Sequence, residues 1–283
     1  MNVKRRWNRG PSMSGDRDSR TLTTEWFDPS ALEAIARRYE EYVVHPISYA
    51  TARDYVDSFE HLRPLASAQG DMKDVQRPWV LKAVLATIPR GGRLLEIGGG
   101  EPYVADIAAR LGYEVWLVDP YDGSGNGPVE YDQFRRACPG VTFVRARFDD
   151  LLEGVPEGAF DCIFSISVLE HLSIDEVNGV FRGMDRFLTP TGRSIHAIDH
   201  ICRGRGDNDD LVRLQHIGRS LGIPRSLLDD ALRDVGTDPE TYYLSVESHN
   251  RWRMYLGLAY AEYPMFSCVS IQIASARSMQ LSE

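Results

Sequence analysis

Short apolar runs alternate with helical patterns through the middle of the chain. In the segments between these runs, apolar residues recur at spacings of three and four, which is typical of amphipathic helices. Strands that alternate with helices predict a doubly wound α/β sheet, mostly parallel, with its ligand site at the carboxyl ends of the strands. The runs that predict strands are 94–97, 114–118, 141–146, 160–167 and 193–198.

The first predicted strand runs directly into glycines. Glu96 stands two residues before Gly98, and Gly99 and Gly100 follow, with a helical pattern from Val104. Glycine permits positive φ and lets a ligand touch the main chain. Such a turn can therefore bind a nucleotide-sized group at the N-terminus of the next helix, although many glycine turns serve packing alone.

Two dinucleotide signatures do not fit. A G-x-G-x-x-G fingerprint from Gly98 would need glycine at position 103, where the chain has tyrosine. A short-chain oxidoreductase would need tyrosine four residues before a lysine. Gln69 stands four residues before Lys73. Pro78 stands four residues before Lys82, so this rival class is nearly excluded.

The second predicted strand ends in an acid. Asp119 follows the run 114–118 and lies 19 residues beyond Gly100, with Pro120 after it. An acid at this position of a βαβ unit can accept hydrogen bonds from both ribose hydroxyls. The alternative is a strand-end aspartate that caps the next turn.

These motifs resemble a known enzyme family. The pattern E-x-G-x-G at 96–100 resembles motif I of the class I S-adenosylmethionine-dependent methyltransferases. The segment V-L-E-H at 168–171 resembles the motif after strand four in the type 11 branch. The stretch R-F-L-T-P-T-G-R at 186–193 is similar to that branch's R-x-L-x-P-G-G-R, with Thr191 where glycine is common.

The resemblance implies a Rossmann-like, seven-stranded sheet and S-adenosyl-L-methionine as cofactor. The two remaining strands are expected at 241–246 and 266–274, the second as an antiparallel edge strand. A helical lid is expected before the first strand and an insertion after the fifth. The implied cofactor-binding residues are Glu96, Gly98, Gly99, Gly100, Asp119, Pro120, Arg147, Phe148, Asp149, Ser165 and Ser167.

The chain departs from the family near the adenine. The family often has an aspartate there that binds the adenine amino group, and alignment on Leu151 puts Arg147 at that position. Phe148 could stack on the ring instead, and Asp149 could take the polar role. The backbone from Ser165 to Ser167 is expected to line the methionine part of the cofactor.

The end of the fifth strand is dense in candidate catalytic groups. His200 is our first candidate for a general base, because an ordinary histidine titrates near neutral pH. The alternative is a strand-end histidine bonded to the following loop. A metal site of His196, Asp199 and His200 is conceivable, but histidine suits magnesium poorly, so no metal is expected.

Two more histidines are weaker candidates for the base. His249 lies in a cluster of arginine and tryptophan at the start of a helical pattern. His171 belongs to the V-L-E-H segment, where a histidine that packs at a helix start is the simpler interpretation.

The chain reads as one domain with appendages. Residues 1–20 are polar and aperiodic, which indicates a disordered tail or a true start at Met13. The expected segments of the domain at 21–283 are a helical lid at 21–72, a cofactor-binding core at 73–200, a substrate-selecting insertion at 201–240, and closing strands and a helix at 241–283.

Composition narrows the choice of partners and compartment. The net charge of −9 does not favour nucleic acid, whose binding needs a basic surface. The chain has no apolar run long enough to cross a membrane, and its four cysteines are far apart. We therefore expect a cytoplasmic protein with reduced thiols.

The leading hypothesis is methyl transfer to a small molecule, most simply to a hydroxyl oxygen of a sugar or natural product. Methylation of an amine or a carboxyl group is the alternative. A cofactor-binding protein without transfer would keep the same motifs, and the oligomeric state is left open.

Overall fold

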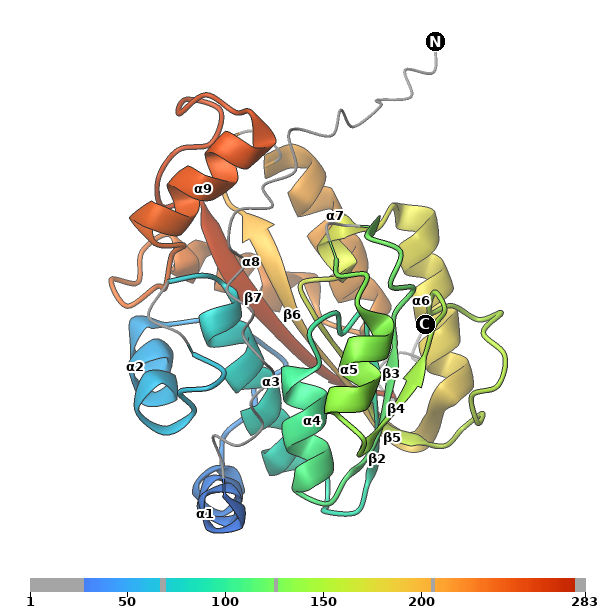
Figure 1. The fold of residues 1–283 in the computed structure, drawn as a ribbon. Helices are drawn as coiled ribbons and strands as arrows, with labels where there is room; N and C mark the ends of the chain where they lie inside the picture. Colours follow the sequence, from blue (N-terminus) through green and yellow to red (C-terminus); the bar gives the residue numbers. More distant parts are fainter. Residues whose placement is uncertain (1–27, 67–69, 125–126, 205–206, 278–283) are drawn as a thin grey trace.

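The computed structural model describes residues 28–66, 70–124, 127–204 and 207–277. A seven-stranded sheet in the order β1-β7-β6-β5-β2-β3-β4 forms its centre (Figure 1). The predicted tail 1–20 and the start of the predicted lid lie outside the described residues. The strands are β1 (Ile47–Tyr49), β2 (Arg93–Ile97), β3 (Glu114–Val118), β4 (Val141–Val144), β5 (Phe160–Ile166), β6 (Leu188–Ile201) and β7 (Cys268–Ala276).

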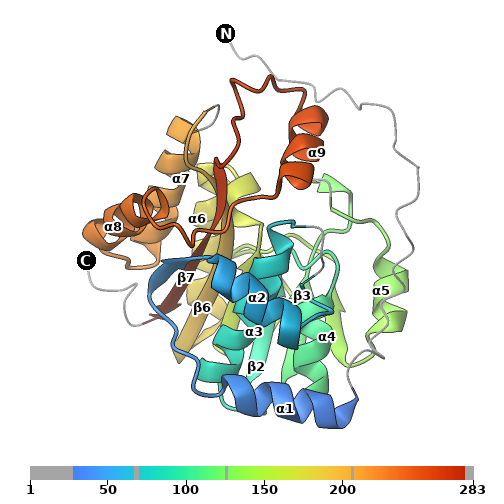
Figure 2. The same cartoon turned by 90° about the vertical axis from the view of Figure 1, so that its left-hand side faces the viewer.

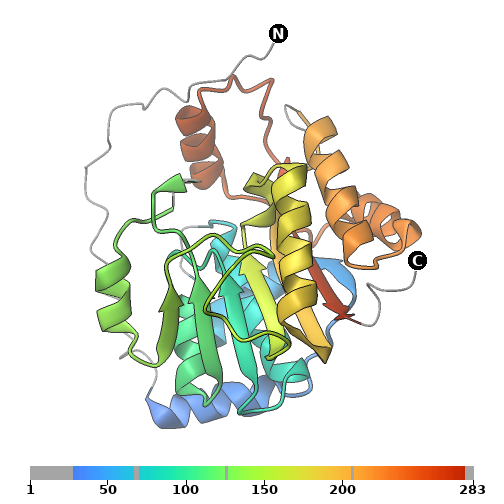
Figure 3. The ribbon, with the colours of Figure 1, turned by 90° about the vertical axis from the view of Figure 1, so that its right-hand side faces the viewer.

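Helices cover both faces of this sheet. Figure 2 shows α2, α3 and α4 on one face, and Figure 3 shows α6 and α7 on the other. The described helices are α1 (Pro29–Tyr39), α2 (Ala52–His61), α3 (Lys73–Thr87), α4 (Tyr103–Arg110), α5 (Tyr131–Ala137), the short 3₁₀ helix η3 (Leu169–His171), α6 (Ile174–Phe187), α7 (Asp207–Ser220), α8 (Arg225–Val235) and α9 (Val246–Leu256).

The predicted doubly wound arrangement is confirmed. β4, β3, β2, β5 and β6 are parallel neighbours, and β2 lies between β3 and β5. Alternate residues of each strand enter separate cores: Leu94 joins the core under α3 and α4, whereas Leu95 joins the core under α6. Because both faces are buried, the parallel strands are mostly apolar and do not alternate between apolar and polar residues.

The antiparallel strand is confirmed, but it is not at the edge. β7 pairs antiparallel with β6 on one side and with β1 on the other, so the three-residue β1 is the edge strand. The predicted strand at 241–246 is wrong. It makes only isolated bridges, because the hydroxyls of Thr241 and Tyr243 donate to the Val235 carbonyl at the end of α8.

The N-terminal helices divide between two positions. α1 begins as predicted: Asp28 caps it by accepting from the Ala31 N–H, and Pro29 is its first residue. It packs on α3 at the end of the sheet opposite α9, so it does not cover the carboxyl ends of the strands (Figure 2). α2 starts after β1, with Thr51 and Asp54 forming a capping box.

An ion pair with one buried partner joins α2 to α3. The Lys82 side chain is only 2% exposed and that of Asp57 is 30% exposed, and the ammonium lies 2.6 Å from an Asp57 carboxylate oxygen. Asp57 also accepts hydrogen bonds from Tyr39 and Arg38 of α1. Burial alone would raise the pKa of Asp57, but the bonds from Lys82, Tyr39 and Arg38 hold it below its ordinary value. Among the helices of the described residues, none is long and apolar enough to cross a membrane.

Candidate functional site

The turn after β2 requires its glycines. Gly98 and Gly100 have φ of +62° and +48°, which side chains rarely tolerate. A Cβ on Gly98 would lie 2.8 Å from the side chain of Val168, and one on Gly99 would lie 2.5 Å from that of Leu117. The backbone therefore turns tightly at the carboxyl end of β2, as the sequence predicted for a ligand-binding turn.

Asp119 holds this turn in shape. Its buried carboxylate accepts the N–H of Gly100 at 3.1 Å and the N–H of Tyr121 at 2.7 Å. Pro120 lies between Asp119 and Tyr121, and the Tyr121 hydroxyl donates to the Gly100 carbonyl at 3.1 Å. Burial raises the pKa of Asp119, and the two N–H bonds oppose that shift. Each carboxylate oxygen can accept a further hydrogen bond, which suits a pair of ribose hydroxyls.

Glu96 fits a cationic ligand group. Its carboxyl is buried, and Oε2 has no hydrogen-bond partner in the part of the chain that the structure describes. Burial raises the pKa of Glu96 to about 8, although the charges of Arg77 and Lys73 oppose the shift. A buried carboxyl oxygen without a partner is costly unless a ligand satisfies it. An ammonium group, such as that of the methionine part of S-adenosyl-L-methionine, fits this position.

The residues predicted near the adenine have different surroundings. Arg147 is exposed and pairs with Glu176 at 3.3 Å. The Phe148 ring is buried against Phe187, with 5.7 Å between ring centroids, so in this structure it packs in the core and has no free face for stacking. Asp149 accepts the N–H of the Leu151 backbone at 2.8 Å, which makes it part of a local turn.

The two predicted serines lie in different surroundings. Ser165 is fully buried and shares a hydrogen bond of 2.8 Å with Nδ1 of His196, so its side chain does not line the site. Ser167 follows the end of β5 with a φ of +54°. This left-handed backbone breaks the alternation of the strand and directs the Ser167 side chain toward Asp199 and α3.

A hydrogen-bonded group at the carboxyl ends of β5 and β6 was not predicted as a unit. Asp199 accepts from the Ser167 hydroxyl at 2.7 Å and from the Gln76 amide at 2.8 Å. The Asp199 N–H donates to Glu170 at 2.9 Å. We call this group the Asp199 cluster, and its members are Lys73, Gln76, Ser167, Glu170 and Asp199.

The cluster contains carboxyls that resist ionisation. Burial raises the pKa of Asp199 to about 7, and the Glu170 carboxylate adds to the shift while Lys73 opposes it. Burial also raises the pKa of Glu170 and lowers that of Lys73, whose ammonium donates to the Ile166 carbonyl at 3.2 Å. A carboxyl that titrates near neutral pH is suited to proton transfer.

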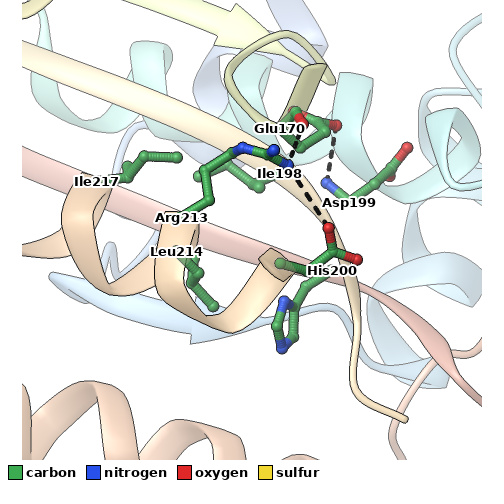
Figure 4. A pocket seen from close by; sticks show the side chains of 8 residues that line it. Glu170, Ile198, Asp199, His200, Arg213, Leu214 and Ile217 are labelled. Atoms are coloured by element: carbon green, nitrogen blue, oxygen red, sulfur yellow. Dashed lines mark hydrogen bonds and ion pairs between the residues drawn. The ribbon is translucent and has the colours of Figure 1, made fainter. Parts of the chain in front are cut away.

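A small cavity adjoins the cluster between β6, η3 and α7 (Figure 4). Arg213 of α7 donates to the Glu170 carbonyl at 2.7 Å and lies 3.5 Å from Asp210. α7 therefore supplies one wall, and it belongs to the segment predicted to select the substrate. The cavity is lined by Glu170, Ile198, Asp199, His200, Asp210, Arg213, Leu214 and Ile217.

The three candidate histidines differ in position. His200 lies on the cavity but is 3% exposed, and burial lowers its pKa to about 4. His171 is exposed at its surface. Desolvation lowers its pKa, and the charge of the nearby Asp199 carboxylate opposes that shift. His249 belongs to α9 and is buried, its ring stacks on Tyr263, and Nε2 donates to the Tyr263 carbonyl at 2.9 Å. His171 therefore lies near the Asp199 carboxylate, whereas His200 is on the other face of β6 and His249 packs against Tyr263.

Sequence reasoning missed Lys73 and Gln76 as site residues and considered Asp199 only as a metal ligand. Both missed residues lie in the first turns of α3, a helix that is otherwise strongly apolar and buried. One sequence signal could have identified them. The segment is a mostly apolar helix whose polar residues concentrate in its first turns, near the carboxyl ends of the strands.

Comparison with known families supports the prediction made from the motifs. Residues 68–200 match the family model described as a methyltransferase domain. This range contains the predicted core at 73–200, with the glycine turn, Asp119 and the Asp199 cluster. Residues 68–200 thus match a methyltransferase domain, as the motifs predicted, and S-adenosyl-L-methionine stays the expected cofactor.

Curated relatives match over part of their length. Two uncharacterized protein sequences of Mycobacterium tuberculosis, from two strains, are 30% identical over 125 residues, which is 42% of this chain and 39% of each relative. The match thus spans about two fifths of the length of these curated relatives.

Two solved structures resemble the chain more distantly. Geranyl diphosphate C-methyltransferase from Streptomyces coelicolor has 13% identity and a TM-score of 0.44, covering 89% of this chain and 100% of that chain. The 1,6-didemethyltoxoflavin-N1-methyltransferase from Burkholderia thailandensis has 16% identity and a TM-score of 0.43, covering 88% and 90%. At these TM-scores, neither enzyme's acceptor carries over to this chain.

Proposed function

We propose that this chain, whose residues 68–200 are a class I S-adenosylmethionine-dependent methyltransferase domain, methylates a hydroxyl oxygen of a small molecule such as a sugar or natural product. The observation that carries this proposal is the Asp199 carboxyl at the carboxyl ends of β5 and β6, where Ser167 and Gln76 hold it beside the end of β5 that is expected to line the methionine part of the cofactor. When bound, the cofactor supplies a methyl group on a positively charged sulfur. The protein's own part is to align the acceptor and to accept its proton.

Residues on neighbouring strands could hold both the cofactor and the methyl acceptor. Glu96 and the glycine turn would hold the methionine part of the cofactor, and Asp119 would hold the ribose. The acceptor would lie at the carboxyl ends of β5 and β6, beside the Asp199 cluster, and Arg213 of α7 bonds to the Glu170 carbonyl there. This arrangement supports selection of the acceptor by segment 201–240.

The charges in the Asp199 cluster affect which acceptor is favoured. In their ionised forms the Asp199 and Glu170 carboxyls would repel an anionic acceptor, which makes carboxyl methylation the weakest of the three chemistries. An amine is the second candidate, because the same carboxyls would attract an ammonium group and accept its proton. The net charge of −9 argues against nucleic acid as a partner. We also propose a cytoplasmic location, since all four cysteines are free thiols.

Transfer of a labelled methyl group tests this function. The protein is incubated with methyl-tritiated S-adenosyl-L-methionine and three panels of small molecules: neutral glycosides and phenols, amines, and carboxylates. We expect label in the hydroxyl panel. Label in the amine panel alone would establish the second candidate, and cofactor binding without transfer to any panel would favour a binding protein. The Asp119→Ala variant controls for background exchange.

The His200→Ala variant tests the base predicted first from the sequence. A general base contributes roughly a hundredfold or more to a proton-transfer step. Because burial lowers the pKa of His200 to about 4, we expect its imidazole to be a weak base. The variant should therefore keep kcat within about threefold. A hundredfold loss of kcat with cofactor binding intact would restore His200 as the base.

A further inference from the structure

The side chain of Asp199 is held in a fixed orientation near the carboxyl end of β6, on the face of the sheet that α3 covers. Ser167 donates to Oδ2 and Gln76 donates to Oδ1, while the Asp199 N–H is anchored on Glu170. Asp199 is only partly buried, whereas Gln76 is fully buried. Each oxygen retains a lone pair for a ligand proton.

Asp199 also lies close to the predicted cofactor site. Lys73 on α3 is near enough to Glu96 and to Asp199 to lower the pKa of both carboxyls by its charge. The Lys73 ammonium itself donates to the Ile166 carbonyl, at the end of the strand between them. Glu96 and Asp199 thus flank one lysine, on either side of the β5 end that is expected to line the methionine part of the cofactor.

We propose that Asp199 is the proton acceptor in the methyl transfer, and that the positive charge of the bound cofactor converts its carboxyl to the anionic form before reaction. This inference rests on the function proposed above. In the transfer step, the acceptor oxygen forms a bond to the methyl carbon. The sulfur–methyl bond breaks with its electron pair remaining on sulfur, and the hydroxyl proton moves to Asp199, which later releases it to solvent.

Charged and titratable groups surround Asp199 on the elements that pack against it. Together with burial, they place its carboxyl close to equal populations of the neutral acid and the carboxylate at neutral pH. Glu170 and Asp71 favour the neutral acid, while Lys73 favours the anion. A positive sulfur nearby would shift this balance toward the anion. The facing groups are Asp71, Lys73, Glu170, His171, Asp210, Arg213, Tyr263 and Cys268.

Proton release on binding tests the proposal without knowledge of the acceptor. Isothermal titrations with S-adenosyl-L-methionine and with S-adenosylhomocysteine are run at pH 7 in two buffers of different ionisation enthalpy. The two ligands share the ammonium group that faces Glu96, but only the first has a positive sulfur. Since the pKa of Asp199 is about 7, we expect S-adenosyl-L-methionine to release about half a proton more per molecule than S-adenosylhomocysteine.

The Asp199→Asn variant assigns the extra proton. An amide at this position can keep the hydrogen bond from Gln76 and donate to the Ser167 oxygen, so the variant should fold, which thermal unfolding verifies. We expect it to bind both ligands with equal proton release. Asp229→Asn, which removes an exposed carboxyl on α8, is the matched control and should retain the difference.

Two results would overturn the role of Asp199, and a third, distinguishable result would overturn the proposed function. A wild-type protein with equal proton release for both ligands overturns the proposal. An extra proton that survives in Asp199→Asn assigns it to another group and also overturns it. If neither ligand binds to the wild-type protein, the proposed function itself fails.

Discussion

Replacing Asp57 with alanine is expected to lower the free energy of unfolding by about 3–5 kcal/mol. The change leaves the Lys82 ammonium, 2% exposed, without its carboxylate partner at 2.6 Å. The Ser58 hydroxyl at 3.1 Å and the faces of two tyrosines would remain, but they carry no compensating charge. Urea unfolding of the two proteins measures the difference.

Two further variants test whether the unpaired Lys82 ammonium causes the loss of stability. Adding Lys82→Met to Asp57→Ala removes the buried charge, and we expect it to restore most of the lost stability. The Glu33→Ala variant breaks the exposed pair with Arg90 and should cost less than about 1 kcal/mol. If Asp57→Ala costs no more than Glu33→Ala, the pair contributes little and α1 and α2 are held by apolar packing.

Replacing Asp119 with alanine is expected to weaken S-adenosyl-L-methionine binding by ten- to a hundredfold, which corresponds to about 1.5–3 kcal/mol for charge-assisted hydrogen bonds. The variant loses the proposed ribose contacts. It also leaves the N–H groups of Gly100 and Tyr121 without their acceptor, so the glycine turn loses support. Calorimetric titration gives the affinity.

Asp119→Asn separates these two contributions. Its amide oxygen can still accept one backbone N–H, so the turn should be better preserved than in the alanine variant, and we expect intermediate affinity. Equal and unchanged affinity in both variants would contradict the role of Asp119 in cofactor binding and would leave it as a turn cap.

The parallel part of the fold could be predicted because each strand is buried on both faces. Leu94 and Leu95 enter opposite cores, so the strand is apolar on both faces apart from Glu96, which belongs to the candidate site. β1 gave no such signal, since its three residues are only partly buried beside a proline. The segment 241–246 has strong strand propensity, but its hydrogen bonds to the end of α8 decide its position, and propensity does not contain that information.

The site was predictable only where its residues are neighbours in sequence. Glu96 and the glycines form one short motif, so they could be identified together. Gln76 meets Asp199 across 123 residues, and Lys73 meets Ile166 across 93. Phe148 shows the converse, because a plausible local position for a stacking ring is decided by packing against Phe187, which comes from a distant helix.

The order of strands has a consequence for synthesis on the ribosome. β1 is made early, but its partner β7 is the last strand of the described chain, and Ser48 donates to Gln272 across 224 residues. β7 must also enter between β6 and β1. Until β7 has emerged, β6 exposes a long unpaired edge of the kind that promotes misassociation of nascent chains. Translation that stops before β7 should therefore yield an aggregation-prone fragment rather than a smaller folded enzyme.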